Sequence, residues 1–255
     1  LKCAKSRDHT ELFFKNVIKV PIQIKKNRNF DFIKIKGKKI FKSFTYNIPG
    51  DISSAAFFIV LTILNRDSSL LLKNININNS RIGLIKILNL MGSKITFHNK
   101  KKYRGELVGD IKVKSVKKLK SIKCPRKLNS SAIDEMLLLF LVSSVAKGIS
   151  TFSGLEELNK KESKRLDWGI KILKMIGIKT KKISNHGVKI YGNPNLKLRK
   201  IYRIKSYLKD HRIYMLTVIA GLTLGGKWII NDPDAIKTSF PSFNKLVMQL
   251  GAKLN

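Results

Sequence analysis

The sequence predicts an α/β protein built largely from three copies of one helix–strand–helix unit. Each copy opens on an aspartate, continues as an apolar run typical of a buried helix, and turns into a strand of β-branched and apolar residues. Each copy then closes with a second helix and a glycine placed to end it in the left-handed conformation. These aspartate and glycine pairs, 41, 43 and 41 residues apart, are Asp51 and Gly92, Asp134 and Gly177, and Asp210 and Gly251.

The first 46 residues fit this unit only in part. The segment "SRDHTELFFKNVIKV" resembles the second helix of a unit, with Arg7 in the register of Arg81 and Ile18 where glycine is expected. No first helix precedes it, so we expect the chain to begin inside a repeat. Residues 21–45, rich in Ile and Lys, predict the strands that close this half unit. A boundary near residues 47–49 would separate the remainder of a first domain, residues 1–46, from a second domain of three α/β repeat units, residues 47–255.

The chain carries a formal net charge of +36 over 255 residues, which is usually typical of a nucleic-acid-binding protein. The excess consists of 42 Lys against only 10 Arg, and it is accompanied by abundant Ile and Asn, as A- and T-rich codons produce. Arg, the side chain that reads bases and grips phosphates in a fork, is not enriched. We therefore expect weak, salt-sensitive binding but no specific nucleic-acid partner.

Other features exclude several classes of protein. The longest apolar runs, residues 57–64 and 136–145, fall short of the roughly 20 residues that span a bilayer. The first residues lack the apolar region of a secretory signal. Cys3 and Cys124 match neither a disulfide framework nor a metal site. The glycines of "GLTLGG" follow an apolar helix instead of a strand, so they predict a turn and no nucleotide loop. We expect a cytoplasmic protein without membrane contact, cofactor or metal.

Seven motifs identify a family. "SRDHTE", "PGDISSAAFF", "SRIGL", "IDE", "KESKRL", "DHRIYM" and "TSFPSF" occur in the order and at about the spacing of the 5-enolpyruvylshikimate-3-phosphate (EPSP) synthases. The chain resembles that family over nearly its whole length, but only over the later part of the family's length. The resemblance implies an α/β fold of repeated βαβαββ units that form an inside-out α/β barrel, the enolpyruvyl transferase type.

The resemblance also implies a reaction. The enolpyruvyl (1-carboxyvinyl) group of phosphoenolpyruvate would pass to the 5-hydroxyl of shikimate 3-phosphate with release of phosphate, a step of the shikimate pathway to chorismate and the aromatic amino acids. Both small-molecule substrates are anions, which explains why cations would gather at the site. No cofactor is implied.

Two carboxylates resemble the family's proton-handling residues. Asp134 in "IDE" resembles the acceptor of the proton from the attacking hydroxyl, and it would also bind shikimate 3-phosphate. From the residues alone, the alternative for Asp134 is simple capping of a helix. Glu162 in "KES" resembles the second catalytic carboxylate, and its alternative is an i, i+3 ion pair with Arg165.

Several cations resemble substrate ligands. Arg7 and Lys161 correspond to contacts with shikimate 3-phosphate, whereas Arg165 and Arg212, with His211 beside it, correspond to ligands of phosphoenolpyruvate. The alternatives are an exposed surface position for Arg7 and a solvated pair with Glu157 for Lys161. A continuous helix would place Lys161 and Arg165 one turn apart, where like charges repel unless an anion lies between them.

Other positions carry weaker signals or departures from the family. Lys237 is a candidate phosphate ligand, although related proteins carry Lys one position later. Ser53 and Ser54 favour tight helix packing. Lys164 stands where the family usually has Asp, and Tyr214 stands where a small residue is common, which predicts local repacking.

Two other functions remain open at this level. One is the related enolpyruvyl transferase that acts on UDP-N-acetylglucosamine. The other is a degenerate basic fragment with a nucleic-acid or assembly role. The family's N-terminal basic residues have no counterpart here, so we expect little turnover by this chain alone and allow for a separate chain that supplies the missing N-terminal half.

Overall fold

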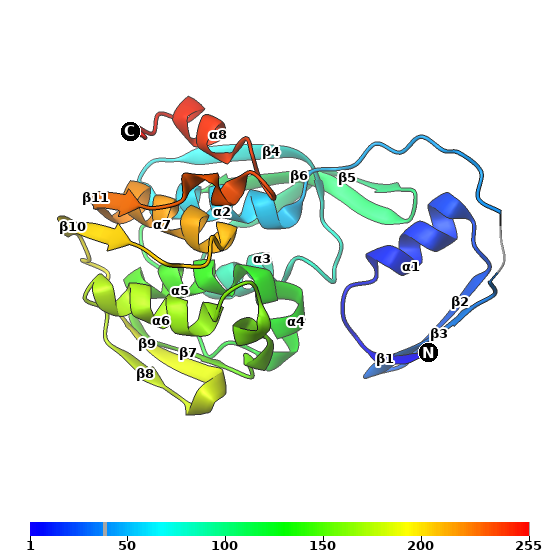
Figure 1. The fold of residues 1–255 in the computed structure, drawn as a ribbon, viewed down its shortest axis with the longest axis horizontal. Helices are drawn as coiled ribbons and strands as arrows, with labels where there is room; N and C mark the ends of the chain where they lie inside the picture. The colour runs from blue at the N-terminus through cyan, green and yellow to red at the C-terminus, as the bar shows by residue number, and fades with distance from the viewer. Residues whose placement is uncertain (38–39, 255) are drawn as a thin grey trace.

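A computed structural model describes residues 1–37 and 40–254 as an α/β protein (Figure 1). Its α-helices are α1 His9–Phe13, α2 Ile52–Leu64, α3 Gly83–Leu90, α4 Asn129–Ala132, α5 Met136–Val145, α6 Arg165–Met175, α7 His211–Leu224 and α8 Phe243–Gln249. Its strands are β1 Lys2–Ala4, β2 Ile22–Lys26, β3 Phe30–Ile35, β4 Ser69–Asn76, β5 Ile95–Tyr103, β6 Glu106–Lys114, β7 Gly148–Ser153, β8 Thr180–Lys182, β9 Gly187–Gly192, β10 Leu198–Ile204 and β11 Gly225–Ile230.

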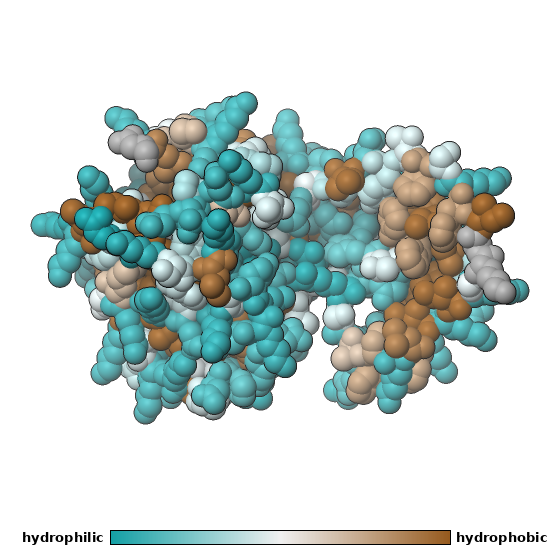
Figure 2. All heavy atoms as spheres, in the orientation of Figure 1, coloured by the Kyte–Doolittle hydropathy of each residue, from teal (hydrophilic) through white to brown (hydrophobic). Residues whose placement is uncertain are grey.

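The N-terminal elements form a small part of their own beside a larger body (Figure 1). Strands β1, β3 and β2 make an antiparallel sheet with β3 in the middle. The strands expected within residues 21–45 are present as the antiparallel pair β2 and β3, but β1 was not anticipated. The first helix continues as a π-helical turn, and Lys19 takes the positive φ of 62° one residue after the position where glycine was expected. Figure 2 shows hydrophobic side chains gathered over this part. Its exposed apolar side chains include Phe30, Phe32 and Phe41.

The larger body contains the predicted repeat. The successions α2–β4–α3, α5–β7–α6 and α7–β11–α8 follow the expected helix–strand–helix order. The closing glycines all have positive φ, 99° at Gly92, 82° at Gly177 and 96° at Gly251, so each ends its helix as predicted. The sheets are β4-β6-β5 and β7-β9-β8, both antiparallel, and the parallel pair β10-β11.

The three opening aspartates do not behave alike. The Asp51 and Asp210 side chains accept hydrogen bonds from the first turns of α2 and α7, as N-caps do. Asp134 instead lies in a 3₁₀ turn, Ile133–Glu135, and makes no capping hydrogen bond to α5. Simple helix capping is therefore wrong for Asp134, because other side chains occupy its carboxylate.

The first helices of the three repeats form the centre of the core. Helices α2, α5 and α7 pack against one another and are apolar on all sides, which is typical of a fully buried helix. One longer helical stretch, Arg126–Val145, is long and apolar enough to cross a membrane, but 67% of its apolar window is buried inside the protein. It has the burial of a core helix.

Lys161 and Arg165 do not lie one turn apart on a continuous helix, as their spacing suggested. A 3₁₀ helix, Glu156–Lys160, ends before Lys161, and α6 begins only at Arg165. The Asn159 side chain accepts a hydrogen bond from the Leu166 amide at 2.9 Å. An N–H group in the first turn of α6 is thereby paired from outside the helix. Lys161 consequently lies between the two helices with an extended backbone, so helical spacing does not set the direction of its side chain.

Candidate active site

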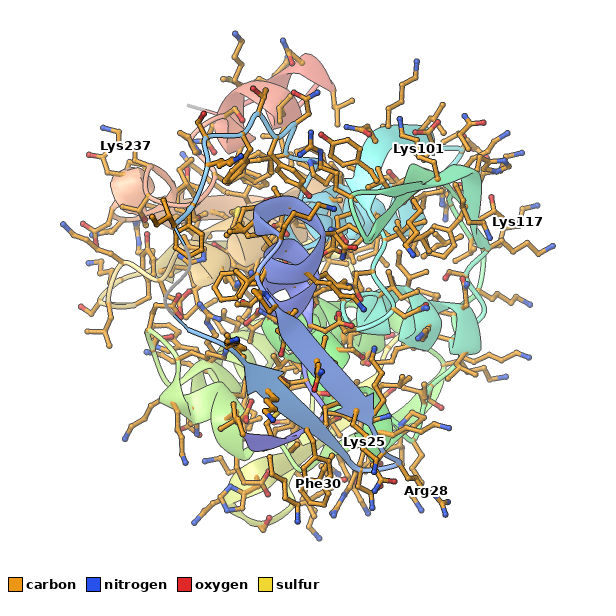
Figure 3. The ribbon with its side chains drawn as sticks, turned by 90° about the vertical axis from the view of Figure 1, so that its right-hand side faces the viewer. Lys25, Arg28, Phe30, Lys101, Lys117 and Lys237 are labelled. Carbon is orange, nitrogen blue, oxygen red and sulfur yellow. The ribbon has the colours of Figure 1, made fainter. Side chains whose placement is uncertain are left out.

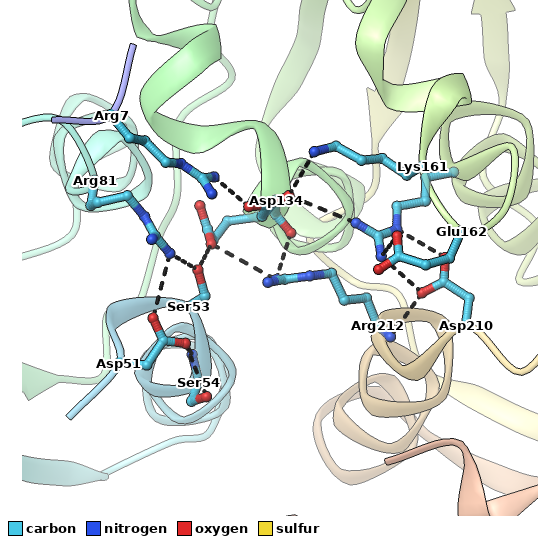
Figure 4. Close-up of polar contacts among 12 residues, drawn as sticks. Arg7, Asp51, Ser53, Ser54, Arg81, Asp134, Lys161, Glu162, Asp210 and Arg212 are labelled. Atoms are coloured by element: carbon cyan, nitrogen blue, oxygen red, sulfur yellow. Dashed lines mark hydrogen bonds and ion pairs between the residues drawn. The ribbon is translucent and has the colours of Figure 1, made fainter. Parts of the chain in front are cut away.

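Asp134 is the centre of a cluster of cations that come from distant parts of the chain (Figure 4). Arg7 Nη2, just before α1, donates a hydrogen bond to Asp134 Oδ2. Lys161 Nζ lies 3.3 Å from Oδ1, and Arg165 Nη1 lies 3.8 Å from the same oxygen. The fold thus brings together three cations that the sequence analysis assigned to two different substrates.

These cations determine the ionisation of Asp134, whose side chain is only 11% exposed. Burial raises the pKa of this carboxyl, but Arg212, Arg7 and Lys161 together hold the pKa well below its usual range. The carboxylate is therefore ionised and a weak base while the cations face it. Anions that engage Arg7 and Lys161 would share these cations and raise the pKa of Asp134 towards a value useful for proton transfer.

Arg165 is held in place by two further carboxylates. Its side chain is 1% exposed, and its Nε and Nη2 donate to Asp210 at 2.9 and 3.2 Å. Nη2 also donates to Glu162 Oε2 at 2.5 Å. Burial raises the pKa of Asp210, but its bonds with Arg165 outweigh burial and lower the pKa. A buried guanidinium needs such partners, and Ser163 Oγ completes the set by donating to Asp210 at 2.8 Å.

Arg212 and His211 lie at the start of α7. Arg212 Nη1 donates to the Asp134 carbonyl oxygen at 2.8 Å and lies 3.8 Å from Glu135 Oε1. Burial, and then the neighbouring Arg212, lowers the pKa of His211, so the neutral imidazole is favoured.

Glu162, with its side chain 51% exposed, can reach solvent. The Glu162–Arg165 pair that the residues alone suggested is therefore present, together with the wider cluster. By contrast, Lys161 pairs with Asp134, and the proposed solvated pair with Glu157 is not among its described ion pairs.

Three residues of the network were missed in the sequence. Ser53 Oγ donates to Glu135 Oε1 at 2.5 Å and accepts from Arg81 Nη2 at 2.5 Å, so its role exceeds tight packing. Ser54 only supports the Asp51 cap. Arg81 could have been found from its shared register with Arg7, whereas Glu135 looked like an ordinary start of an apolar helix.

Other predicted positions lie elsewhere. Lys237 is 70% exposed and pairs with Asp234 at 2.8 Å, and Figure 3 shows it at the edge of the molecule, away from the centre. Lys164 is exposed and precedes α6. The buried Tyr214 hydroxyl accepts a hydrogen bond from Asn244 at 3.1 Å, an arrangement that accommodates the bulky ring by local packing.

A cavity of about 480 Å³ borders the cluster on the side of the N-terminal part. Arg81 and Asp51 line it together with His9, Tyr46 and Glu106. Within residues 1–37 and 40–254, no group of three or more His, Cys, Asp or Glu side chains could hold a metal ion. The cations around Asp134 can bind anions through fixed guanidinium and ammonium groups, and the carboxylates beside them can move protons.

Comparisons with known proteins agree with the motifs. A family model described as EPSP synthase (3-phosphoshikimate 1-carboxyvinyltransferase) matches residues 1–246. The 3-phosphoshikimate 1-carboxyvinyltransferase of Ruthia magnifica subsp. Calyptogena magnifica is 38% identical over 252 residues, 99% of this chain and 56% of that protein. The protein of the same name from Hydrogenovibrio crunogenus is 36% identical over 249 residues, 97% of this chain and 55% of that protein. The chain spans just over half the length of these curated relatives.

Solved structures give the same picture of the fold. An EPSP synthase from Acinetobacter baumannii superposes with a TM-score of 0.83 at 31% identity, covering 96% of this chain and 54% of that one. The enolpyruvyl transferase NikO from Streptomyces tendae gives a TM-score of 0.72 at 14% identity, covering 98% and 54%, a likeness of fold alone. The enolpyruvyl transferase type of α/β fold is confirmed.

Proposed function

This chain belongs to the EPSP synthase family, and we propose that it forms the later part of an enzyme that makes 5-enolpyruvylshikimate 3-phosphate. The enzyme transfers the enolpyruvyl group of phosphoenolpyruvate to the 5-hydroxyl of shikimate 3-phosphate and releases phosphate. Residues 47–255 constitute the second domain, and residues 1–46 are the remainder of the first. The exposed apolar side chains of the N-terminal part support this division, because a complete domain would bury most of them.

One observation carries the proposal. Arg7 from the N-terminal part and Lys161 from the second repeat both reach the carboxylate of Asp134. In the proposed reaction, Arg7 and Lys161 bind shikimate 3-phosphate, and Asp134 accepts the proton of its 5-hydroxyl as that oxygen attacks phosphoenolpyruvate. Binding of this anion moves the two cations onto the substrate, which frees Asp134 to act as a base.

Phosphoenolpyruvate is bound by the adjacent cations of the second and third repeats. Arg165 and Arg212 are fixed by buried partners, so they offer charge without reorganisation during the reaction. His211, as a neutral imidazole, can donate a hydrogen bond to an oxygen of this substrate. Glu162 is the second proton-handling group, because addition across the double bond also requires a proton on the methylene carbon, and its exposed side chain can exchange protons with water. Lys237 is left out of this assignment.

The two alternative functions, a UDP-sugar enolpyruvyl transferase and a degenerate fragment, have less support. The relatives named above are shikimate enzymes, which favours shikimate 3-phosphate over a UDP-sugar as substrate. A degenerate fragment is disfavoured, because cations from distant parts of the chain still converge on the carboxylate of Asp134. The site would be completed by an N-terminal half of the kind found in the relatives, either on the same native chain or on a separate one. A cytoplasmic location belongs to the same proposal.

The test is to complete the site. The part of the Ruthia magnifica relative outside the match would be joined ahead of this chain, and phosphate release would be followed with both substrates. We expect turnover that requires shikimate 3-phosphate and is not supported by UDP-N-acetylglucosamine, with little turnover from the 255-residue chain alone. A well-folded fusion without activity towards shikimate 3-phosphate would refute the proposal.

A further inference from the structure

The first helices of the three repeats begin next to one another, and each contributes one polar group to a single contact. Ser53 comes from α2, Glu135 from the turn before α5, and Arg212 from α7. Glu135 Oε1 lies between the other two, 2.5 Å from Ser53 Oγ and 3.8 Å from Arg212 Nη1. The residue that follows the proposed base in sequence therefore connects all three repeats.

Burial of Glu135 costs the fold free energy. It is 2% exposed, and its Oε2 has no hydrogen-bond partner in the described part of the chain. An unsatisfied buried carboxyl oxygen costs free energy, and apolar residues commonly stabilise such a position better. Burial raises the pKa of Glu135 despite Arg212 and Ser53, in keeping with a weakly compensated group. Stability alone does not explain this residue.

The geometry of Arg212 supplies an explanation. Within residues 1–37 and 40–254, the hydrogen bond and the ion pair of its guanidinium both use Nη1, with the Asp134 carbonyl oxygen and Glu135 Oε1 as partners. Nη2 and Nε are thereby left as donors. A planar guanidinium held along one edge presents the other edge in a fixed direction, which suits two oxygens of an anion.

The contact continues beyond Glu135. Ser53 receives a hydrogen bond from Arg81 Nη2 at 2.5 Å while it donates to Glu135 Oε1, the same oxygen that faces Arg212. Arg81 Nη2 also lies 3.4 Å from Asp51, the cap of α2. Arg212 is thus positioned through a chain of contacts anchored in the first repeat (Figure 4).

We propose that Glu135 is a positioning residue for phosphoenolpyruvate: its buried carboxyl holds the Nη1 edge of Arg212 so that Nη2 and Nε face the anion. This inference rests on the proposed function for the identity of the anion, but the orientation of Arg212 by Glu135 does not depend on it. Glu135 itself touches neither substrate.

Two substitutions of Glu135 separate the effect of its acceptor oxygen from the effect of its charge. Glu135→Gln keeps an oxygen acceptor at the same place, whereas Glu135→Ala removes it, and Glu157→Ala at an exposed position serves as the matched control. Dissociation constants for phosphoenolpyruvate and shikimate 3-phosphate would be measured by calorimetry on the 255-residue chain. We expect Glu135→Ala to weaken phosphoenolpyruvate binding about tenfold, with shikimate 3-phosphate changed less than about twofold and Glu135→Gln close to the parent. Equal losses for both ligands, or none for phosphoenolpyruvate, would overturn the proposal.

A second readout needs no substrate. The side-chain Nε–H resonance of Arg212 reports how tightly the guanidinium is held, and it should show faster motion in Glu135→Ala than in Glu135→Gln or Glu157→Ala. An unchanged resonance would overturn the positioning role. If Arg212 loosens in Glu135→Ala but the completed fusion shows no turnover, the proposed function is in error and the positioning role remains. Melting temperatures of all three variants confirm that the comparison is made between folded proteins.

Discussion

Arg7 donates a hydrogen bond to Asp134, a carboxylate 127 positions further along the chain. This contact connects the N-terminal part with the second repeat at the middle of the candidate site. Three further polar contacts lie beside it: His9 with Glu106, and Asp8 with Asn78 and with Ser80. Binding of a substrate by Arg7 therefore also depends on how the N-terminal part is placed against the larger body.

Replacement of Arg7 tests this relationship. Arg7→Ala should weaken binding of shikimate 3-phosphate about tenfold, because a charge-assisted hydrogen bond to a phosphate or hydroxyl is lost. Arg28→Ala is the control, since Arg28 is exposed between β2 and β3 and Figure 3 shows it at the edge of the molecule. Calorimetric titration of each variant measures the effect. Equal affinities of Arg7→Ala and the parent would remove Arg7 from the site.

Asp134→Asn tests the proposed base. The amide keeps the size of the side chain but cannot accept the hydroxyl proton, so kcat of the completed enzyme should fall by at least about a hundredfold. Because Arg7 and Lys161 are released from a counter-charge, shikimate 3-phosphate should bind at least as tightly as before. Steady-state rates and calorimetry check the two halves of this expectation. A variant that retains near-parental kcat would assign the proton transfer to another group.

Stability should depend on acid pH in a definite direction. For Asp8, Glu106, Asp134 and Asp210, burial raises the pKa, but ion pairs and hydrogen bonds outweigh it and leave each pKa lowered. The unfolded chain therefore takes up protons first as the pH falls, so the stabilisation is present above about pH 5 and is lost progressively below about pH 4. Urea unfolding at a series of pH values measures this loss. Asp234→Asn, at an exposed position, should leave the profile unchanged, and a flat profile down to about pH 3 would contradict the assignment.

Much of the fold was predictable because its signals are local. A buried helix, a strand and a terminal glycine recur with nearly constant spacing, and each feature depends on a few neighbouring residues, as Gly92 and Gly177 illustrate. Strand β1 was missed because three residues, Lys2–Ala4, carry no periodic pattern and pair with β3 about thirty positions away.

The site was predictable only in part. Family motifs indicated Asp134 and Arg165, but Lys161 and Arg165 do not share the helix that spacing suggested. Asn159 accepts a hydrogen bond from the Leu166 amide, and Ser163 donates to the distant Asp210, and spacing along the chain reveals neither contact. Glu135 was missed for the same reason. Its partners come from two other repeats, and nothing in its neighbourhood along the chain distinguishes it from an acidic residue at a helix start.

Arg165 connects catalysis with stability, and its replacement should affect both. Arg165→Met removes the charge but keeps an apolar side chain of similar reach, which leaves Asp210 buried with Ser163 and the Arg212 amide as its remaining partners. Breaking one member of a buried ion pair typically costs about 3–5 kcal/mol, so the free energy of unfolding should fall by that order. Arg203→Met, on the exposed side of β10, should change it by less than about 0.5 kcal/mol. The double variant Arg165→Met with Asp210→Asn should recover part of the loss, because the uncompensated carboxylate is then gone. Urea unfolding of the parent, the two single variants and the double variant measures these differences.

An Arg165→Met variant as stable as the parent would contradict this expectation. It would mean that the pair with Asp210 does not hold the start of α6 against α7, and that the buried position of Arg165 is maintained by packing alone.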